Sequence, residues 1–336
     1  MIKKVTSIND DLFNDAITFT ESCERGNIFQ HPILFKVLTS LDDFEPFLFV
    51  NYNSNKNRID GSLFGYKQNL TKFGGFKRSL IINGPLIEDN NPEILSDILQ
   101  NYLLDLNRKV ICTEVRNNCN TNKDIFHTLG FQFEDHLNYE IDLQRPIDEI
   151  WSSICRKRRN AIHKGIKNNV KIIETGNMND ISYGYKILKK NYIRIGVPLP
   201  SMDFFLSFCR FLLPLGFMKV YKAEFEDVVI GILFCLISNG RMNAWYTAID
   251  YDYCRLRTQD VIFWYSIANA YEMGLSVYDL GGAGKPNVDY GPRRFKAKFN
   301  GILTNYGRYQ FKHRPILMKI AQSGYYGCKK INKIRF

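Results

Sequence analysis

The sequence predicts a mixed α/β (α+β) protein with two domains. Its 336 residues exceed the roughly 100 to 200 residues of a typical domain, so two hydrophobic cores are expected. Helical and strand-like runs alternate in the first half, whereas three consecutive strand-like runs open the final part of the second. The hydrophobic fraction of 45% and the aromatic fraction of 14% supply enough apolar area for both cores.

The first domain is expected to cover residues 1–145, with its boundary at Arg145-Pro146. Gly130 follows a short helix as its cap, before a strand that runs to Leu143. The earlier elements are a helix near Asp10–Cys23, strands at Phe47–Asn51 and Asp60–Tyr66, a helix over Pro92–Leu106 and a strand at Val110–Val115. Residues 308–336 are expected to return to this domain and complete it.

The second domain, residues 146–307, is expected to begin with an amphipathic helix from Pro146 to beyond Ile166. After a helical region come strands at Phe217–Glu224, Val228–Ser238 and Arg241–Ile249, a helix over Thr258–Met273 and a strand at Ser276–Leu280. This order is that of the GNAT acyltransferase core, in which a central strand splays from its neighbour and an acyl donor enters the gap. The sequence therefore predicts two GNAT-like domains in tandem.

The loop before the helix at Thr258 argues against conventional coenzyme A binding. GNAT enzymes carry glycines there, because bare backbone N–H groups must approach the pyrophosphate. The loop Cys254–Gln259 contains no glycine. Arg255 and Arg257 remain available for some other phosphate.

Positive charge is concentrated in two segments. Between Arg156 and Lys171 there are seven Lys or Arg and no acid, and between Lys312 and Phe336 there are again seven and none. Such patches favour phosphate-bearing partners, namely nucleic acid, nucleotide-linked substrates or anionic lipid, although a solvated basic face is the simpler interpretation. The second patch also contains Ile316, Leu317 and Tyr325-Tyr326, which suits a peripheral membrane contact or a helix packed on the first domain.

Several classes of protein are disfavoured. The eight cysteines include no CxxC pair and the five histidines no metal-type spacing, so no metal site is expected. The N-terminus does not resemble a secretory signal, and no apolar run is long enough to span a bilayer. A cytoplasmic protein is expected, peripheral at the inner membrane face if residues 312–336 contact lipid.

Three groups of motifs stand out in the sequence. The strongest group is a helix ending at Gly274, then Tyr278-Asp279-Leu280-Gly281-Gly282, then Gly291…Phe295-Lys296…Phe299. The second is the run Arg159–Val170, and a looser third comprises Phe29-Gln30 with Lys36, Gly84-Pro85 and Tyr192-x-Arg194-x-Gly196. Together they resemble the motifs of the FemABX aminoacyl transferases, which look like paired GNAT domains and add amino acids from aminoacyl-tRNA to peptidoglycan precursors. As in the shorter family members, no coiled-coil arm is inserted.

The resemblance implies that Phe295 and Lys296 lie at the active centre, with the lysine contacting phosphate or the reacting acyl carbonyl. Alternation along residues 293–299 favours an extended segment with Lys296 opposite Phe295. Asp279 ends a strand at the expected cleft, where it either orients and deprotonates the incoming amine or only caps the turn.

Further candidates concern substrate binding. Arg159 and Arg194 are expected to clamp the diphosphate of the acceptor, because guanidinium groups bind phosphate oxygens bidentately. Tyr246 is a candidate for hydrogen bonding to the acceptor, or a core aromatic residue. The resemblance implies a substrate contact for Lys36, and Tyr290 lies on a loop that could close over the substrate.

The expected activity is transfer of an aminoacyl group from aminoacyl-tRNA to an amine of a peptidoglycan or related envelope precursor. The protein is expected to act as a monomer without a bound cofactor, with tRNA and a nucleotide- or lipid-linked precursor as its partners. Two alternatives stay open. One is a Fem-like N-acyltransferase that uses acyl-CoA or an acyl carrier on an amino sugar, and the other is a non-catalytic protein that binds RNA or membrane.

Overall fold

The computed structural model describes residues 1–70, 76–106, 109–321 and 323, which form two compact units. Unit 1 comprises Met1–Asp135 and the described residues from Tyr306 onward, and unit 2 comprises His136–Asn305. The division therefore falls ten residues before the expected boundary at Arg145-Pro146, because strand β8 (Leu137–Asp142) pairs with strands β13 and β14 of the second sheet. Most of the expected membrane-contact segment 312–336 lies outside the described residues.

Unit 1 is a sheet in the order β1-β2-β3-β4-β6-β15-β7, with β5 paired to β3. Helices α3 and α4 cover one face, where Phe47, Leu63 and Val115 meet Leu99 and Phe126. The elements are β1 (Ile2–Val5), α1 (Leu12–Ser22), α2 (Ile33–Thr39), β2 (Phe44–Asn53), β3 (Arg58–Asn69), β4 (Lys77–Ile82), β5 (Leu86–Ile87), α3 (Pro92–Leu106), β6 (Cys112–Arg116), α4 (Lys123–Thr128), β7 (Gln132–Glu134) and β15 (Arg308–Lys312).

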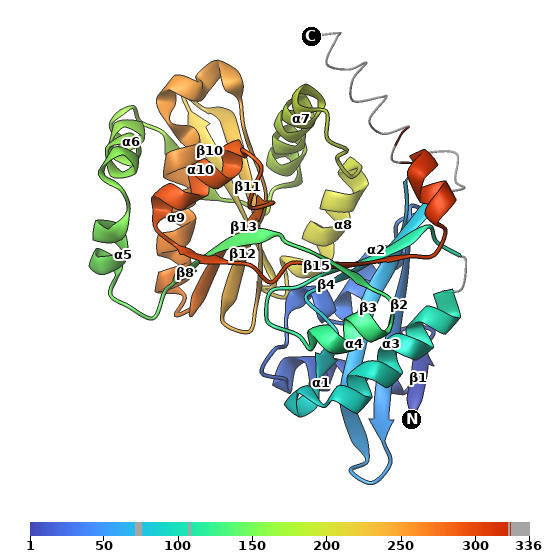
Figure 1. The fold of residues 1–336 in the computed structure, drawn as a ribbon. Coiled ribbons are helices and arrows are strands. Elements are labelled where there is room, and N and C mark those ends of the chain that lie inside the picture. The colour runs from blue at the N-terminus through green and yellow to red at the C-terminus, as the bar shows by residue number, and fades with distance from the viewer. Residues whose placement is uncertain (71–75, 107–108, 322, 324–336) are drawn as a thin grey trace. The chain divides into compact units, whose positions relative to one another are not determined.

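Unit 2 is a sheet in the order β14-β8-β13-β12-β11-β10-β9, with helices on both faces (Figure 1). Strand β11 alternates between the two: Leu233 and Cys235 enter the core with α9, and Phe234 packs on Phe205 of α8. Besides β8, the elements are α5 (Ile147–Ser153), α6 (Arg156–Lys167), β9 (Lys171–Glu174), α7 (Met178–Ile195), α8 (Met202–Leu212), β10 (Met218–Phe225), β11 (Val228–Ser238), β12 (Arg241–Ile249), α9 (Thr258–Glu272), β13 (Val277–Gly284), α10 (Gly291–Lys296) and β14 (Ile302–Thr304).

The structure corrects two local expectations. The helix expected from Pro146 is interrupted at Ile154–Cys155, where ψ angles of 134° and 139° are far from the helical value, so α5 and α6 are separate helices. The segment around Phe295-Lys296 is helical: α10 begins at Gly291-Pro292 and a 3-10 turn continues to Phe299. Proline in the first turn favours a helix because its φ is preset and its missing N–H has no helical partner.

Within the described ranges, no helix is long and apolar enough to cross a membrane.

Candidate functional site

The central strands of unit 2 separate partway along their length. Strand β12 pairs with β13 in parallel only from Arg241 to Asn243, opposite Val277 to Asp279. Beyond this point each strand stays with its other neighbour, β12 with β11 as far as Ile249 and β13 with β8 as far as Gly284. Residues 244–249 and 280–284 thus form the two arms of an opening, called the fork below.

A β-bulge lies at the start of the fork. The register of β12 against β11 shifts between Cys235 and Phe234, which leaves Trp245 without an opposing residue. Bulges bend a strand and increase its twist, so this one turns β12 away from β13. In unit 1 the corresponding parallel pair, β4 and β6, stays in register over the five residues Arg78–Ile82. The opening is therefore a property of unit 2.

The ammonium of Lys296 lies at the fork. Its Nζ donates a 2.9 Å hydrogen bond to the carbonyl oxygen of Gly282. A methyl group added at Gly281 would lie 3.4 Å from this Nζ and 3.3 Å from the carbonyl oxygen of Ala244 on the other arm. Burial lowers the pKa of Lys296 to about 8, and the charge of Asp279 acts in the opposite direction. Lys296 is half-buried, and a pKa of about 8 leaves its ammonium a cation at neutral pH.

Asp279 lies at the base of the fork in a network of ion pairs and hydrogen bonds. One carboxylate oxygen accepts from Asn138 Nδ2 at 2.8 Å and from the backbone N–H of Gly281 at 2.7 Å. The other lies 3.4 Å from Arg241 Nη1, which also pairs with Glu140 at 3.1 Å. Burial, with a contribution from Asp279, raises the pKa of Glu140. Through these contacts Asp279 holds the backbone around Gly281. This matches one of the two roles expected for the residue, that of stabilising the turn.

Three tyrosines lie along the fork. Tyr246 is on β12, and its ring centroid lies 6.1 Å from that of Tyr192 on α7. A methyl group added at Gly284 would lie 3.0 Å from Cδ1 of Tyr290, so this ring covers the end of β13. Burial raises the pKa of Tyr192 to about 12, and the Tyr290 phenol adds to the rise. The structure therefore brings Tyr246 and Tyr290, both candidates from the sequence, to the same opening, together with Tyr192.

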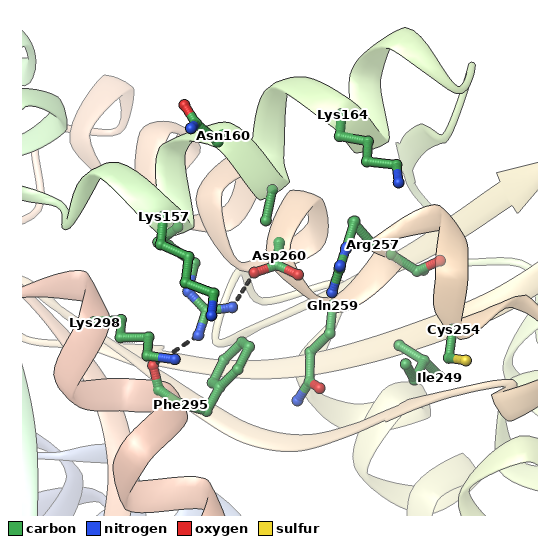
Figure 2. Close-up of a pocket in the computed structure, with 13 residues that line it drawn as sticks. Lys157, Asn160, Lys164, Ile249, Cys254, Arg257, Gln259, Asp260, Phe295 and Lys298 are labelled. Carbon is green, nitrogen blue, oxygen red and sulfur yellow. Dashed lines mark hydrogen bonds and ion pairs between the residues drawn. The ribbon is translucent and has the colours of Figure 1, made fainter.

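A pocket of about 450 Å³ lies at the N-terminus of α9 (Figure 2). Ile249, the last residue of β12, lines this α9 pocket, so it adjoins the outer end of the fork. Its basic lining residues come from three segments: Lys157, Arg158 and Lys164 from α6, Arg257 from the loop before α9, and Lys298 from the turn after α10.

The charge of the α9 pocket is not neutralised within the described residues. Its single lining carboxylate, Asp260, forms a buried ion pair with Arg158. None of Lys157, Lys164, Arg257 and Lys298 has a carboxylate within ion-pairing distance there. The hydroxyl of Thr258, which is fully buried and lines the pocket, has no hydrogen-bond partner among these residues. Four cations, a free hydroxyl and a helix N-terminus together suit a polyanion.

Phe295 forms part of the wall of the α9 pocket. The Arg158 guanidinium stacks over its ring at 3.9 Å and donates a 3.1 Å hydrogen bond to its carbonyl oxygen. On its other side the ring packs against Phe263 and Phe299, which lies one helical turn later. The side chain anchors α10 and so holds Lys296, its chain neighbour, at the fork.

The loop before α9 differs from a glycine-rich phosphate loop. Arg257 has φ +65° and ψ +26°, the left-handed conformation that glycine adopts most easily. Helix α6 packs closely on this loop, because a methyl group added at Gly165 would lie 3.0 Å from the carbonyl oxygen of Leu256. Backbone N–H groups are therefore less open to a pyrophosphate than in a glycine loop, and the arginine side chain supplies the charge.

The other candidates from the sequence lie elsewhere. Arg194 stacks on Tyr251 at 3.7 Å, beside a second pocket of about 320 Å³ lined mainly by apolar atoms. Arg159 donates to the backbone carbonyl of Ser152 at the end of α5, and it does not line the α9 pocket. Lys36 is an exposed residue of α2 in unit 1. The structure does not bring these three side chains together within one unit.

Sequence reasoning did not identify several residues of the site. Lys157 and Lys164 belong to the basic run Arg156–Lys171, but the sequence does not show which of its residues line the pocket. The packing of α6 on α9 places these two lysines there. Neither Arg241 nor Glu140 was indicated by the sequence, and Tyr192 was noted only as part of the Tyr192-x-Arg194-x-Gly196 motif, without a role at the site. Among the described residues no group of three or more His, Cys, Asp or Glu side chains is placed to hold a metal ion.

Comparisons with known proteins agree with this geometry. Residues 189–297, which include both arms of the fork, match the acetyltransferase (GNAT) domain family. The structure of FemX superposes with a TM-score of 0.73 at 11% identity, covering 95% of this chain and 99% of FemX. The chain has a FemX-like tandem GNAT fold. No curated protein matches the sequence.

Other solved structures share the FemX-like fold. L-PGS from Bacillus licheniformis has a TM-score of 0.59 at 12% identity, covering 98% of this chain and 99% of that one. A tandem GNAT protein from the clavulanic acid biosynthesis pathway has a TM-score of 0.54 at 8% identity, covering 93% and 99%. The tandem GNAT fold predicted from the sequence is thus confirmed, and the fork is the splayed strand pair of that fold.

Proposed function

We propose that this FemX-like protein is an aminoacyltransferase, which moves an aminoacyl group from aminoacyl-tRNA to an amine of a peptidoglycan or related envelope precursor. The observation that carries the proposal is the half-buried ammonium of Lys296 at the fork, next to a cationic pocket without a glycine loop. The fork accommodates the acyl group, and the α9 pocket accommodates the phosphates of the donor.

The reaction requires little dedicated machinery. The amine nitrogen attacks the carbonyl carbon of the aminoacyl ester, the new C–N bond forms as the ester C–O bond breaks, and the amine proton ends on the ribose oxygen. Aligning the two substrates contributes roughly 7 to 11 kcal/mol, and a fixed cation at the developing oxyanion roughly 3 to 4 kcal/mol. Lys296 supplies the cation, and Asp279 with Arg241 holds the strand on which it rests.

The acceptor is assigned to the side of the fork with the tyrosines. Tyr246 and Tyr290 offer phenol groups to its polar atoms. Arg194 and Arg159 remain candidates for the phosphates of a nucleotide- or lipid-linked precursor. Lys36 is a separate candidate for a substrate contact in unit 1. This assignment rests on residue chemistry and on the opening at which the tyrosines lie.

The test uses the purified full-length chain with a pool of radiolabelled aminoacyl-tRNAs and a nucleotide-linked muropeptide, with product detected by mass spectrometry. Labelled amide product is expected, and Lys296→Met should lower the turnover number by about 10²- to 10³-fold because it removes a fixed oxyanion cation. Lys189→Met, at an exposed position of α7, is the matched control. Equal turnover of the Lys296→Met and wild-type chains would exclude this mechanism.

One observation favours a second function. The match of residues 189–297 to an acetyltransferase domain supports an N-acyltransferase that uses acyl-CoA on an amino sugar. Thermal unfolding with and without coenzyme A separates the two donors. A clear rise in the melting temperature, together with acetyl transfer to an amino sugar, would replace aminoacyl-tRNA as the donor.

A further inference from the structure

Helix α6 has a charge pattern that its own stability does not explain. Its first turn, Arg156 to Arg159, is basic at three exposed or half-buried positions and contains no acidic residue. Cations at a helix N-terminus oppose the helix dipole at a cost of about 0.3 to 1 kcal/mol each, and neighbouring like charges add to this. Arg158 pairs with Asp260 and Arg159 donates to a backbone carbonyl oxygen, whereas Arg156 and Lys157 have no carboxylate partner among the described residues. Charges that break a local rule without a partner indicate a functional site.

Four of the basic residues of α6 are exposed. Exposed side chains on this helix are Arg156, Lys157, Asn160, His163, Lys164, Ile166 and Lys167. In the part of the chain that the structure describes, Arg156 and Lys167 have no carboxylate within ion-pairing distance. They lie eleven residues apart, three turns along one stripe, and so about 16 Å from each other. Over this length a nucleic acid duplex presents several phosphates on each strand.

The same helix contributes to the α9 pocket. Lys157 and Lys164 point toward the pocket from α6 (Figure 2). Arg156 and Lys167 do not line it, and they extend the positive charge along the surface. The cavity and the exposed basic residues of α6 therefore form one continuous cationic surface, called the α6 surface below, with an enclosed end and an open end.

The composition of the α6 surface argues against a lipid headgroup layer as its partner. A helix that lies in a membrane interface exposes a broad apolar face. Here Ile162 is buried and only Ile166 is an exposed large apolar residue of α6. Exposed amide and imidazole groups at Asn160 and His163 suit phosphate and ribose oxygens.

We propose that the α6 surface docks the phosphate backbone of an RNA duplex stem, whose single-stranded end enters the α9 pocket. This rests on the proposed function and names the contact by which the donor would be held. Arg156 and Lys167 contact stem phosphates, and Lys157, Lys164, Arg257 and Lys298 surround the phosphates of the end.

The test measures RNA binding without catalysis. A fluorescent RNA hairpin with a single-stranded 3′ end and no aminoacyl group is titrated with the full-length chain between about 50 and 200 mM salt. Arg156→Gln/Lys167→Gln is expected to weaken binding about tenfold and to reduce the slope of log Kd against log salt by about 2. Lys186→Gln/Lys189→Gln, on the exposed side of α7, is the matched control and is expected to bind as the wild type does.

Two outcomes would overturn the proposal. In one, the α6 variant keeps the affinity and salt slope of the wild type while its circular dichroism and melting temperature show that it is folded. In the other, the wild type ignores the hairpin but binds vesicles of phosphatidylglycerol and phosphatidylcholine, and the α6 variant loses that binding. Hairpin binding through α6 in a chain that transfers no aminoacyl group would contradict the proposed function alone.

Discussion

At the residue scale, Phe295 and Lys296 have different roles: Phe295 anchors the helix α10, and Lys296 places a charge at the fork. Phe295 packs among aromatic rings and under the Arg158 guanidinium, whereas Lys296 directs its ammonium toward the opposite side, at the fork. The resemblance that singled out this pair gave no reason for the aromatic residue. The structure provides one, because a helix as short as α10 needs an anchor to hold a charged side chain in place.

The titration of Lys296 predicts a pH dependence. A lysine with a pKa of about 8 is a cation below that pH and neutral above it, so the contribution of the cation to the rate is lost as pH rises through about 8. The wild-type kcat/KM is expected to fall on this alkaline side. Lys296→Arg keeps a permanent charge, so its kcat/KM, although lower at neutral pH, should not show this limb. If kcat/KM of the wild type and of Lys296→Arg fell at the same alkaline pH, the titration would belong to another group.

The buried pair of Arg158 and Asp260 predicts an asymmetric mutational cost. Arg158→Met leaves a carboxylate unpaired at a site where both side chains are at most 10% exposed, and such a change costs about 3 to 5 kcal/mol. Arg158→Met/Asp260→Leu removes both charges and should recover most of this loss. Urea unfolding followed by tryptophan fluorescence measures both. Additive losses in the double variant would show that the two side chains are not coupled.

At the element scale, the fork arises from one extra residue in β12. The strands on either side of the opening were predicted from their apolar runs, and β11, β12 and α9 begin at the expected residues. The bulge at Trp245 could not be predicted, because an inserted residue in a strand leaves the hydrophobic pattern of each half intact. The alternating basic and aromatic residues at 293–299 fit a strand period and so predict a strand, but Pro292 in the first turn favours the helix α10.

Arg257, the residue with left-handed backbone before α9, is expected to lower the stability of the protein while it strengthens RNA binding. Arg257→Gly should raise the free energy of unfolding by up to about 1 kcal/mol, because glycine adopts a positive φ without strain. The same change removes one of the four cations other than Arg158 from the α9 pocket, so RNA binding should weaken and its salt slope should fall by about 1. Melting temperature and hairpin affinity are measured on one preparation. A rise in both the melting temperature and the hairpin affinity of Arg257→Gly would mean that the Arg257 side chain does not contact the ligand.

At the scale of the whole molecule, unit 1 is stabilised by a carboxylate that lies between two arginines. In unit 1, Glu114 accepts from Arg116 at 2.6 Å and pairs with Arg308 at 3.0 Å. Burial by itself raises the pKa of Glu114, but the two arginines outweigh it and hold this pKa at about 2. The carboxylate therefore stabilises unit 1 above about pH 4.5, and its contribution is lost as pH falls from 4.5 to 2.

Glu114→Gln is expected to destabilise unit 1 by about 3 kcal/mol at neutral pH, because it leaves arginines without their partner. The three tryptophans, Trp151, Trp245 and Trp264, all lie in unit 2. Urea unfolding of the variant should therefore begin in the far-ultraviolet circular dichroism before it appears in tryptophan fluorescence, unlike in the wild-type chain. Coincident shifts of both signals would mean that the two units unfold as one.

More of the fold than of the candidate site could be predicted from the sequence. Element order and hydrophobic periods depend on local residues, and these gave the tandem architecture. The site depends on which segments meet: Lys157, Arg257 and Lys298 are far apart in the chain and become neighbours only through the packing of α6 and α10 around α9. Arg159 is a further example: its motif suggested a substrate contact, and the structure adds a hydrogen bond from its guanidinium to the carbonyl oxygen of Ser152 at the end of α5, which the motif does not predict.

The closed strand pair of unit 1 and the open pair of unit 2 place the two halves of the chain under different evolutionary constraints. Where β4 and β6 remain hydrogen-bonded along their length, drift is limited only by the need to keep a ladder intact, so substitutions that preserve its apolar pattern are tolerated. Where β12 and β13 separate after three residue pairs, the two arms, which are buried or half-buried except at Gly282, must keep both their shape and the gap between them. Among relatives, the residues of unit 2 that face the gap should therefore diverge with the substrate, while the matching positions of unit 1 drift freely.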